Sequence, residues 1–100
     1  MLLSQIFKNI LREQNENSDI LEFPKQNTIV SIFRNEKKLL FVPFKDQTIP
    51  NKIRTFVNIL KQNFRVVKVV DRDIGSFEVE FDPREDLNVI VDFIKNEMDK

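Results

Sequence analysis

Residues 66–82 read VVKVVDRDIGSFEVEFD, which is two runs of β-branched and aromatic residues on either side of a polar turn. In the second run, large apolar residues alternate with Glu78 and Glu80, so a strand here has one apolar face and one charged face. Gly75 can take the positive φ that a tight turn between strands needs. The stretch predicts a β-hairpin whose phenylalanine side faces a core.

An earlier stretch has the same pattern. Residues 29–45, IVSIFRNEKKLLFVPFK, align with it without a gap and predict another hairpin. A helix is predicted after each hairpin, because apolar residues recur at i, i+3, i+4, i+7 and i+11 from Ile53 and again from Leu87. The chain therefore contains two hairpin–helix (ββα) units, residues 28–64 and residues 65–99. An ancient duplication and a merely shared binary pattern both explain their similarity.

The last helix is preceded by residues that are common at helix starts. Asp82 is a good N-cap, Pro83 suits the first helical position, and Glu85 stands where a capping box has its acidic residue. This order predicts that the helix begins at Pro83.

The beginning of the chain predicts a further helix over residues 1–14. Its apolar residues have helical spacing and form one stripe: Leu2, Leu3, Ile6, Phe7, Ile10 and Leu11. A polar run over residues 14–19 ends this pattern, because short polar side chains compete for backbone hydrogen bonds. The short and mostly apolar stretch 20–23 then stops at Pro24 and fits a short edge strand, since proline cannot donate to a ladder.

These elements predict one α+β domain over residues 1–100. An N-terminal helix is followed by two ββα units that form a four- to five-stranded antiparallel sheet with helices packed on one face. The order of helix, three strands, helix, two strands and helix resembles that of the small dimeric chaperones of bacterial secretion systems and their relatives. The resemblance lies in topology alone, and fold does not imply function.

The alternation also predicts which way the strand residues point. In the second hairpin the side that carries Phe77, Val79 and Phe81 is predicted to face the core. When the same alternation is applied to the rest of that hairpin and, through the gap-free alignment, to the first hairpin, the residues on the core side are Val30, Ile32, Leu40, Val42, Phe44, Val67 and Val69. The opposite face then carries six apolar residues: Ile29, Phe33, Leu39, Phe41, Val66 and Val70. A face this apolar needs a cover, because burial is worth about 25 cal/mol per Å². Either the N-terminal helix or a partner chain could provide it.

Composition excludes several kinds of chemistry. The 100 residues include no cysteine and no histidine, so disulfides, thiolate nucleophiles, zinc–thiolate sites and Ser-His-Asp catalysis are excluded. We expect no catalytic residues, no cofactor and no metal. No apolar run approaches the length that spans a bilayer, and the N-terminus lacks the basic start of a signal peptide. A cytoplasmic protein without a membrane partner is expected.

Three functions follow from these patterns, in decreasing order of support. The first is a non-enzymatic protein-interaction or adaptor module that self-associates, as a homodimer, through the six apolar residues of the opposite sheet face. The second is a nucleic-acid-binding accessory protein that uses the basic middle of the chain: Lys52, Arg54, Lys61, Arg65 and Lys68. The third is a divalent-metal-dependent enzyme in which Asp71, Asp73 and Glu78 approach one another around the second hairpin.

Overall fold

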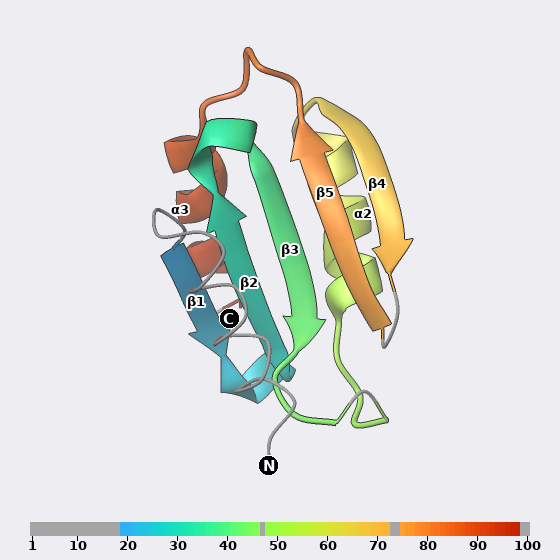
Figure 1. The fold of residues 1–100 in the computed structure, drawn as a ribbon. Helices are drawn as coiled ribbons and strands as arrows, with labels where there is room; N and C mark the ends of the chain where they lie inside the picture. The colour runs from blue at the N-terminus through green and yellow to red at the C-terminus, as the bar shows by residue number, and fades with distance from the viewer. Residues whose placement is uncertain (1–18, 47, 73–74, 99–100) are drawn as a thin grey trace.

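The computed structural model describes residues 19–46, 48–72 and 75–98. Its elements, with η for a 3₁₀ helix, are β1 (Asp19–Phe23), η1 (Pro24–Gln26), β2 (Thr28–Phe33), η2 (Arg34–Glu36), β3 (Lys38–Pro43), α2 (Ile53–Asn63), β4 (Val66–Arg72), β5 (Ser76–Phe81) and α3 (Leu87–Met98). The strands form one antiparallel sheet in the order β1-β2-β3-β5-β4. Both α2 and α3 lie on the same side of it (Figure 1). We call that side the helix-covered face and the other side the outer face.

The two turns that connect β1, β2 and β3 are built alike. In each, a 3₁₀ turn is followed by one residue in the left-handed region, Asn27 with φ 50° or Lys37 with φ 51°. The backbone N–H of that residue donates to the carbonyl of the first turn residue, Pro24 or Arg34. Asparagine enters the left-handed region more easily than lysine does, because its short polar side chain can bond locally.

β3 joins the two halves of the sheet. It pairs with β2 on one side and with β5 on the other, where the ladder runs from Lys38 opposite Glu80 to Phe41 opposite Phe77. The strands at the two edges are β1 and β4. β1 ends directly before Pro24, where a missing N–H costs no ladder bond.

The two helices bury their apolar stripes against the sheet. Their buried side chains are Ile53, Phe56, Val57, Leu60, Leu87, Ile90, Val91, Ile94 and Met98. A chain of ring contacts crosses this core, with centroid separations of 6.0 Å for Phe41–Phe56, 6.2 Å for Phe56–Phe93, 5.3 Å for Phe93–Phe64 and 6.3 Å for Phe64–Phe81. Such pairs add about 0.5–1.5 kcal/mol each beyond area burial, so they tie both helices to β3 and β5.

The predicted class is confirmed in outline: the domain is α+β, with a five-stranded antiparallel sheet and two helices. The helix predicted over residues 1–14 lies outside the described residues. The predicted start of the last helix is wrong, because α3 begins at Leu87. The Asp82 carboxylate instead accepts from the Arg84 backbone N–H at 2.8 Å, and Asp86 accepts from the Asn88 N–H at 2.9 Å. Asp82 therefore closes a turn, and Asp86 is the residue whose carboxylate accepts a backbone N–H at the start of α3.

The predicted phase is right for the first strand of the first hairpin, where Val30 and Ile32 belong to the core, and wrong by one residue for its second strand, β3. Leu39 and Phe41 were expected on the outer face but belong to the core beneath the helices. Leu40 and Val42, expected in that core, point to the outer face. The cause is a difference in turn length, since residues 34–37 separate the paired ends of the first hairpin and only residues 73–75 separate those of the second. A shift of one residue across a turn moves every side chain of the following strand to the other face.

β4 contains a second departure from the prediction. Its pairing with β5 is irregular between Val66 and Lys68. Val66 was expected outside but lies opposite Phe81 and packs against the core. Val67 was expected inside and is instead 54% exposed. A β-bulge leaves its extra residue unpaired and changes the facing of the residues on one side of it.

Candidate functional site

The outer face of the sheet is largely apolar over its first three strands, with Glu22, opposite Ile29, as an acidic residue on β1. The apolar residues, which we call the outer apolar face, are Ile20, Ile29, Phe33, Leu40 and Val42. They share this side because cross-strand partners point the same way: Ile29 lies opposite Val42, and both Ile20 and Leu40 lie opposite Ser31. The five side chains therefore surround one small polar residue.

Burial sets this surface apart from an ordinary solvated sheet face. Ile29 and Val42 are 0% and 1% exposed, although neither belongs to the core cluster beneath α2 and α3. Ser31 is also fully buried, and its hydroxyl oxygen has no hydrogen-bond partner among the described residues. A buried hydroxyl without a partner costs about 1–3 kcal/mol, so the centre of this face behaves as an apolar environment.

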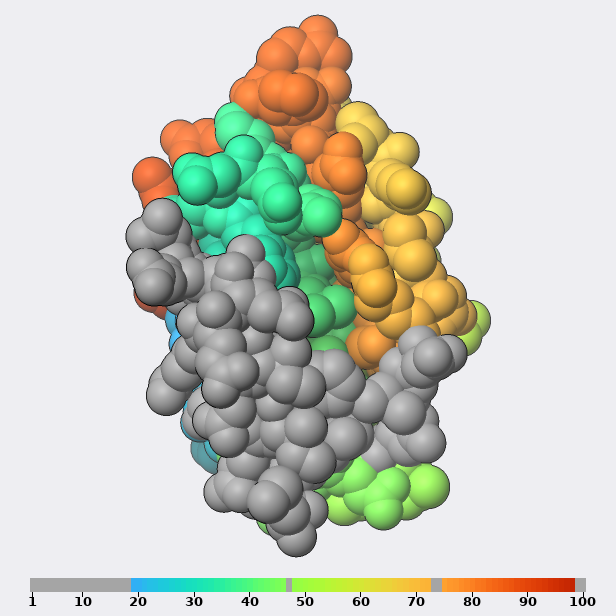
Figure 2. Space-filling view, in the orientation of Figure 1, coloured from blue at the N-terminus to red at the C-terminus, as the bar shows by residue number. Residues whose placement is uncertain are grey.

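The other half of the outer face is charged. Over β4, β5 and the start of β3 it carries Lys38, Lys68, Arg72, Glu78 and Glu80, which we call the outer charged face. These residues line a shallow depression of about 210 Å³. Figure 2 views the molecule from this side, and the atoms of β4 and β5 form its surface there.

Glu78 is the centre of the outer charged face. Its carboxylate accepts from the Lys38 Nζ at 2.8 Å and from the Arg72 Nε at 2.7 Å. The hydrogen bond from Lys38, followed by that from Arg72, lowers the pKa of Glu78 below its ordinary value, against the opposing effect of burial. The same contact raises the pKa of Lys38. Glu78 therefore links two cations from different strands, Lys38 and Arg72, in one ion-pair network.

The six residues predicted to bind a partner do not share one surface. Ile29 and Phe33 lie on the outer apolar face, and Val70 lies on the outer charged side of β4 opposite Glu78. The other three, Leu39, Phe41 and Val66, pack into or against the core. Sequence reasoning missed Leu40 and Val42, although the four residues between Phe33 and Lys38 were a signal that could have set the phase.

The predicted basic set is also dispersed. Lys61 is exposed on α2, whereas Arg65 follows the helix and Lys68 lies across the sheet on the outer charged face. Arg54 lies 5.5 Å over the ring of Phe77, and Lys52 precedes α2 at its other end. The structure does not bring these five residues into one phosphate track, and the nucleic-acid prediction itself stays untested.

The predicted carboxylate site is not assembled. Asp71 lies opposite Phe77 on the helix-covered side, 4.0 Å from Arg54 of α2, while Glu78 lies on the outer face. Asp73 is outside the described residues. In the ranges 19–46, 48–72 and 75–98, no group of three or more histidine, cysteine, aspartate or glutamate residues could hold a metal ion.

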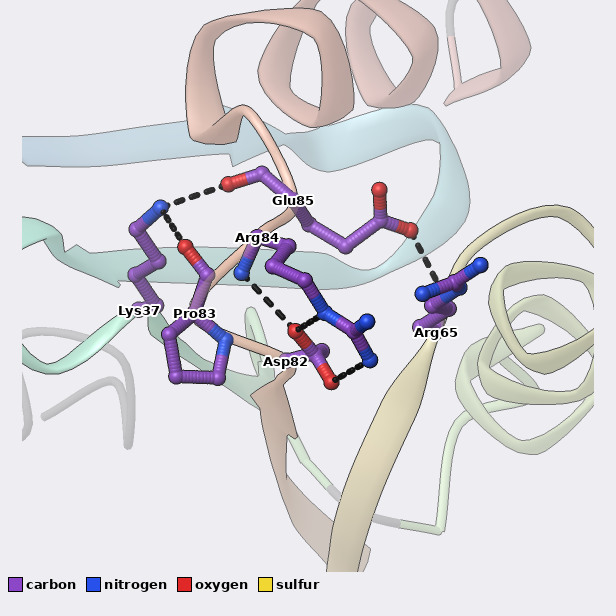
Figure 3. A network of polar contacts seen from close by, with 6 residues as sticks. All are labelled: Lys37, Arg65, Asp82, Pro83, Arg84 and Glu85. Atoms are coloured by element: carbon purple, nitrogen blue, oxygen red, sulfur yellow. Dashed lines mark hydrogen bonds and ion pairs between the residues drawn. The ribbon is translucent and has the colours of Figure 1, made fainter.

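A separate polar network anchors the start of α3 (Figure 3). The Lys37 Nζ donates to the carbonyls of Pro83 at 2.5 Å and Glu85 at 2.6 Å. The Glu85 carboxylate in turn accepts from the Arg65 backbone N–H at 2.6 Å. Arg84 donates to Asp82 and holds the pKa of that carboxyl well below its usual range. The network joins the β2–β3 turn to the segments before β4 and α3, which identifies it as a structural anchor.

Comparisons with known proteins do not add a function to these surfaces. In the described part of the chain, no helix is long and apolar enough to cross a membrane. No protein-family model, no curated protein and no solved structure matches the chain.

Proposed function

We propose that this chain is a non-enzymatic protein-interaction module that accepts an amphipathic helix on its outer apolar face. One observation carries the proposal. Both described helices lie on one side of the sheet (Figure 1), yet the five apolar residues on the other side of β1, β2 and β3 are buried or half-buried and none is exposed. Covering a large aliphatic or aromatic side chain is worth about 1.5–3 kcal/mol. This face therefore favours an apolar occupant.

The shape and borders of this surface suit a helix. Strands of five and six residues, as in β1, β2 and β3, span roughly 17–20 Å, which a helix of about three to four turns can cover. The outer charged face borders it on the β5 side, and burying Lys38 or Glu78 beneath an apolar element would cost desolvation energy. An occupant is thus directed onto the first three strands.

Self-association is one form of this interaction. If the occupant comes from a second copy of the chain, the product is a homodimer held by the same contacts. The chain itself contains a suitable stripe, since Leu3, Ile6, Phe7 and Ile10 have helical spacing.

A peptide titration tests the proposal. A fluorescently labelled peptide with the sequence of residues 1–18 is titrated into the full-length chain and into its Phe7→Asp variant, and anisotropy reports binding. We expect saturable binding that Leu40→Ser weakens about tenfold, because losing one buried leucine contact removes about 1.4 kcal/mol or more. Phe33→Ser should also weaken the binding of the peptide. It serves as the second variant if Leu40→Ser does not fold.

Val89→Ser is the matched control. Val89 is also a large apolar residue, but it is 54% exposed on α3, away from the outer face. Its substitution should leave the affinity unchanged. Absence of binding to both the wild-type chain and the Phe7→Asp variant would overturn the proposed function.

A further inference from the structure

Two apolar surfaces of this chain lack a counterpart among the described residues. One is the outer apolar face, on which no described helix lies (Figure 1). The other is the stripe of Leu3, Ile6, Phe7 and Ile10 that the sequence predicts. We propose that the second surface occupies the first within a single chain, so that residues 2–11 are the resident occupant of the outer apolar face. This inference rests on the proposed function and names its partner.

The point of attachment favours the chain's own segment. Residue 18 leads directly into Asp19, the first residue of the edge strand β1, and Ile20 of that strand already belongs to the outer apolar face. A ten-residue helix is about 15 Å long. The seven residues 12–18 that connect it to β1 reach up to about 25 Å when extended. The segment can therefore turn back over β1, β2 and β3 without strain.

The relief and chemistry of the face fit such a helix. Ser31 is much smaller than its cross-strand neighbours Ile20 and Leu40, so the face is lowest at its centre. A large side chain such as that of Phe7 fits a depression between aliphatic side chains, and close packing is what gives such a contact its energy. Ser31 is fully buried although no described helix lies over it, which agrees with a cover on this part of the face.

The connection of residues 2–11 to β1 through residues 12–18 has a functional consequence. A segment held by a short flexible linker has an effective concentration on the order of millimolar at its own site. A partner's helix must displace it and so binds more weakly than to an open face. Exchange of segments between two copies uses the same contacts and becomes competitive only as the protein approaches that concentration.

Cross-linking of the full-length chain tests where the segment lies. The natural chain has no cysteine, so introduced pairs react without background. Glu22→Cys, at an exposed position on the outer side of β1, is combined with Ile6→Cys or with Ile10→Cys, one turn apart, and treated at low micromolar concentration with a short bis-maleimide. This reagent is chosen because it reaches farther than the roughly 7 Å Cα–Cα limit of a disulfide. Glu22→Cys with Lys8→Cys is the control, since Lys8 lies on the opposite side of the predicted helix.

We expect one or both stripe pairs to give an intrachain cross-link about tenfold faster than the Lys8 pair, because docking raises the local concentration of only the stripe residues. Equal rates for all three pairs would overturn the inference. Interchain cross-links in place of intrachain ones would also overturn it and would name a second copy as the occupant. Peptide binding without a selective intrachain cross-link refutes only this inference. A selective cross-link without any peptide binding refutes the proposed function and makes the face internal core.

Discussion

Asn27 holds the connection between β3 and α2 in place. It lies in the left-handed region and is 5% exposed. Its Nδ2 donates to the carbonyls of Asp46 at 3.2 Å and Ile49 at 3.1 Å, and its Oδ1 accepts from the Lys45 N–H at 2.8 Å. One side chain thus satisfies three backbone groups of a loop that is far from it in sequence.

Substitution of Asn27 tests this role. We expect Asn27→Ala to lower the free energy of unfolding by about 2–3 kcal/mol, because part-buried backbone groups lose their partners. Asn27→Gly should be less damaging by roughly 1 kcal/mol, since glycine enters the left-handed region freely. Urea denaturation measures both values. Wild-type stability in the alanine variant would show that the three hydrogen bonds contribute nothing.

At the level of elements, the turn after β2 also positions the start of α3. The Lys37 ammonium holds two carbonyls of the segment that precedes α3, although its own position at φ 51° is unfavourable for lysine (Figure 3). The contact spans more than forty residues of sequence. It explains why a lysine is placed where a glycine would be less strained.

We expect Lys37→Met to lower the free energy of unfolding by about 1–3 kcal/mol, because methionine keeps the aliphatic stem and removes a charged donor. Both residues have a Cβ, so the backbone penalty is the same. Lys95→Met, at an exposed position on α3, is the control and should change stability little. Chemical denaturation followed by circular dichroism gives both numbers, and equal effects of the two substitutions would contradict the anchoring role.

The elements themselves were largely predictable. The helical spacing from Ile53 and from Leu87 gave α2 and α3, because a 3.6-residue period is a local property. The facing of Leu39 and Phe41 was not predicted, since it depends on one residue of turn length that a gap-free alignment ignores. The Lys37 contacts could not be predicted either, because no local pattern indicates which distant carbonyls an ammonium will meet.

For the whole molecule, the outer face divides into an apolar half and a charged half. The sequence did indicate an apolar outer surface and a charged strand, through Ile29 and Phe33 on the one side and Glu78 and Glu80 on the other. It also placed both groups on the side of one sheet that lies opposite the core, but it did not indicate which strands join them. The two halves meet through the pairing of β3 with β5, which connects distant parts of the chain.

The charged half predicts a response of the whole fold to acid. Since the folded protein lowers the pKa of Glu78, its ionised form stabilises the fold above the ordinary glutamate pKa of about 4.3. That contribution is lost as the pH falls through the lower folded pKa. We expect the free energy of unfolding to decrease as the pH is lowered through this range. The decrease should be less steep in Glu78→Gln, which has no carboxylate to protonate at this position. Urea denaturation at a series of pH values measures the two slopes. Parallel profiles would contradict a stabilising role for the Glu78 ion pairs.

Because β3 pairs with β5, which comes later in the chain, one edge of β3 stays unpaired during part of synthesis. When residues 1–64 have left the ribosome, β1, β2 and β3 can already form a three-stranded sheet. The strand that pairs with the free edge of β3, residues 76–81, has not yet been made. During that interval β3 is an open edge that carries Leu39 and Phe41, the kind of strand that nascent chains use to aggregate. The arrival of β5 therefore covers the open edge of β3 and completes the sheet.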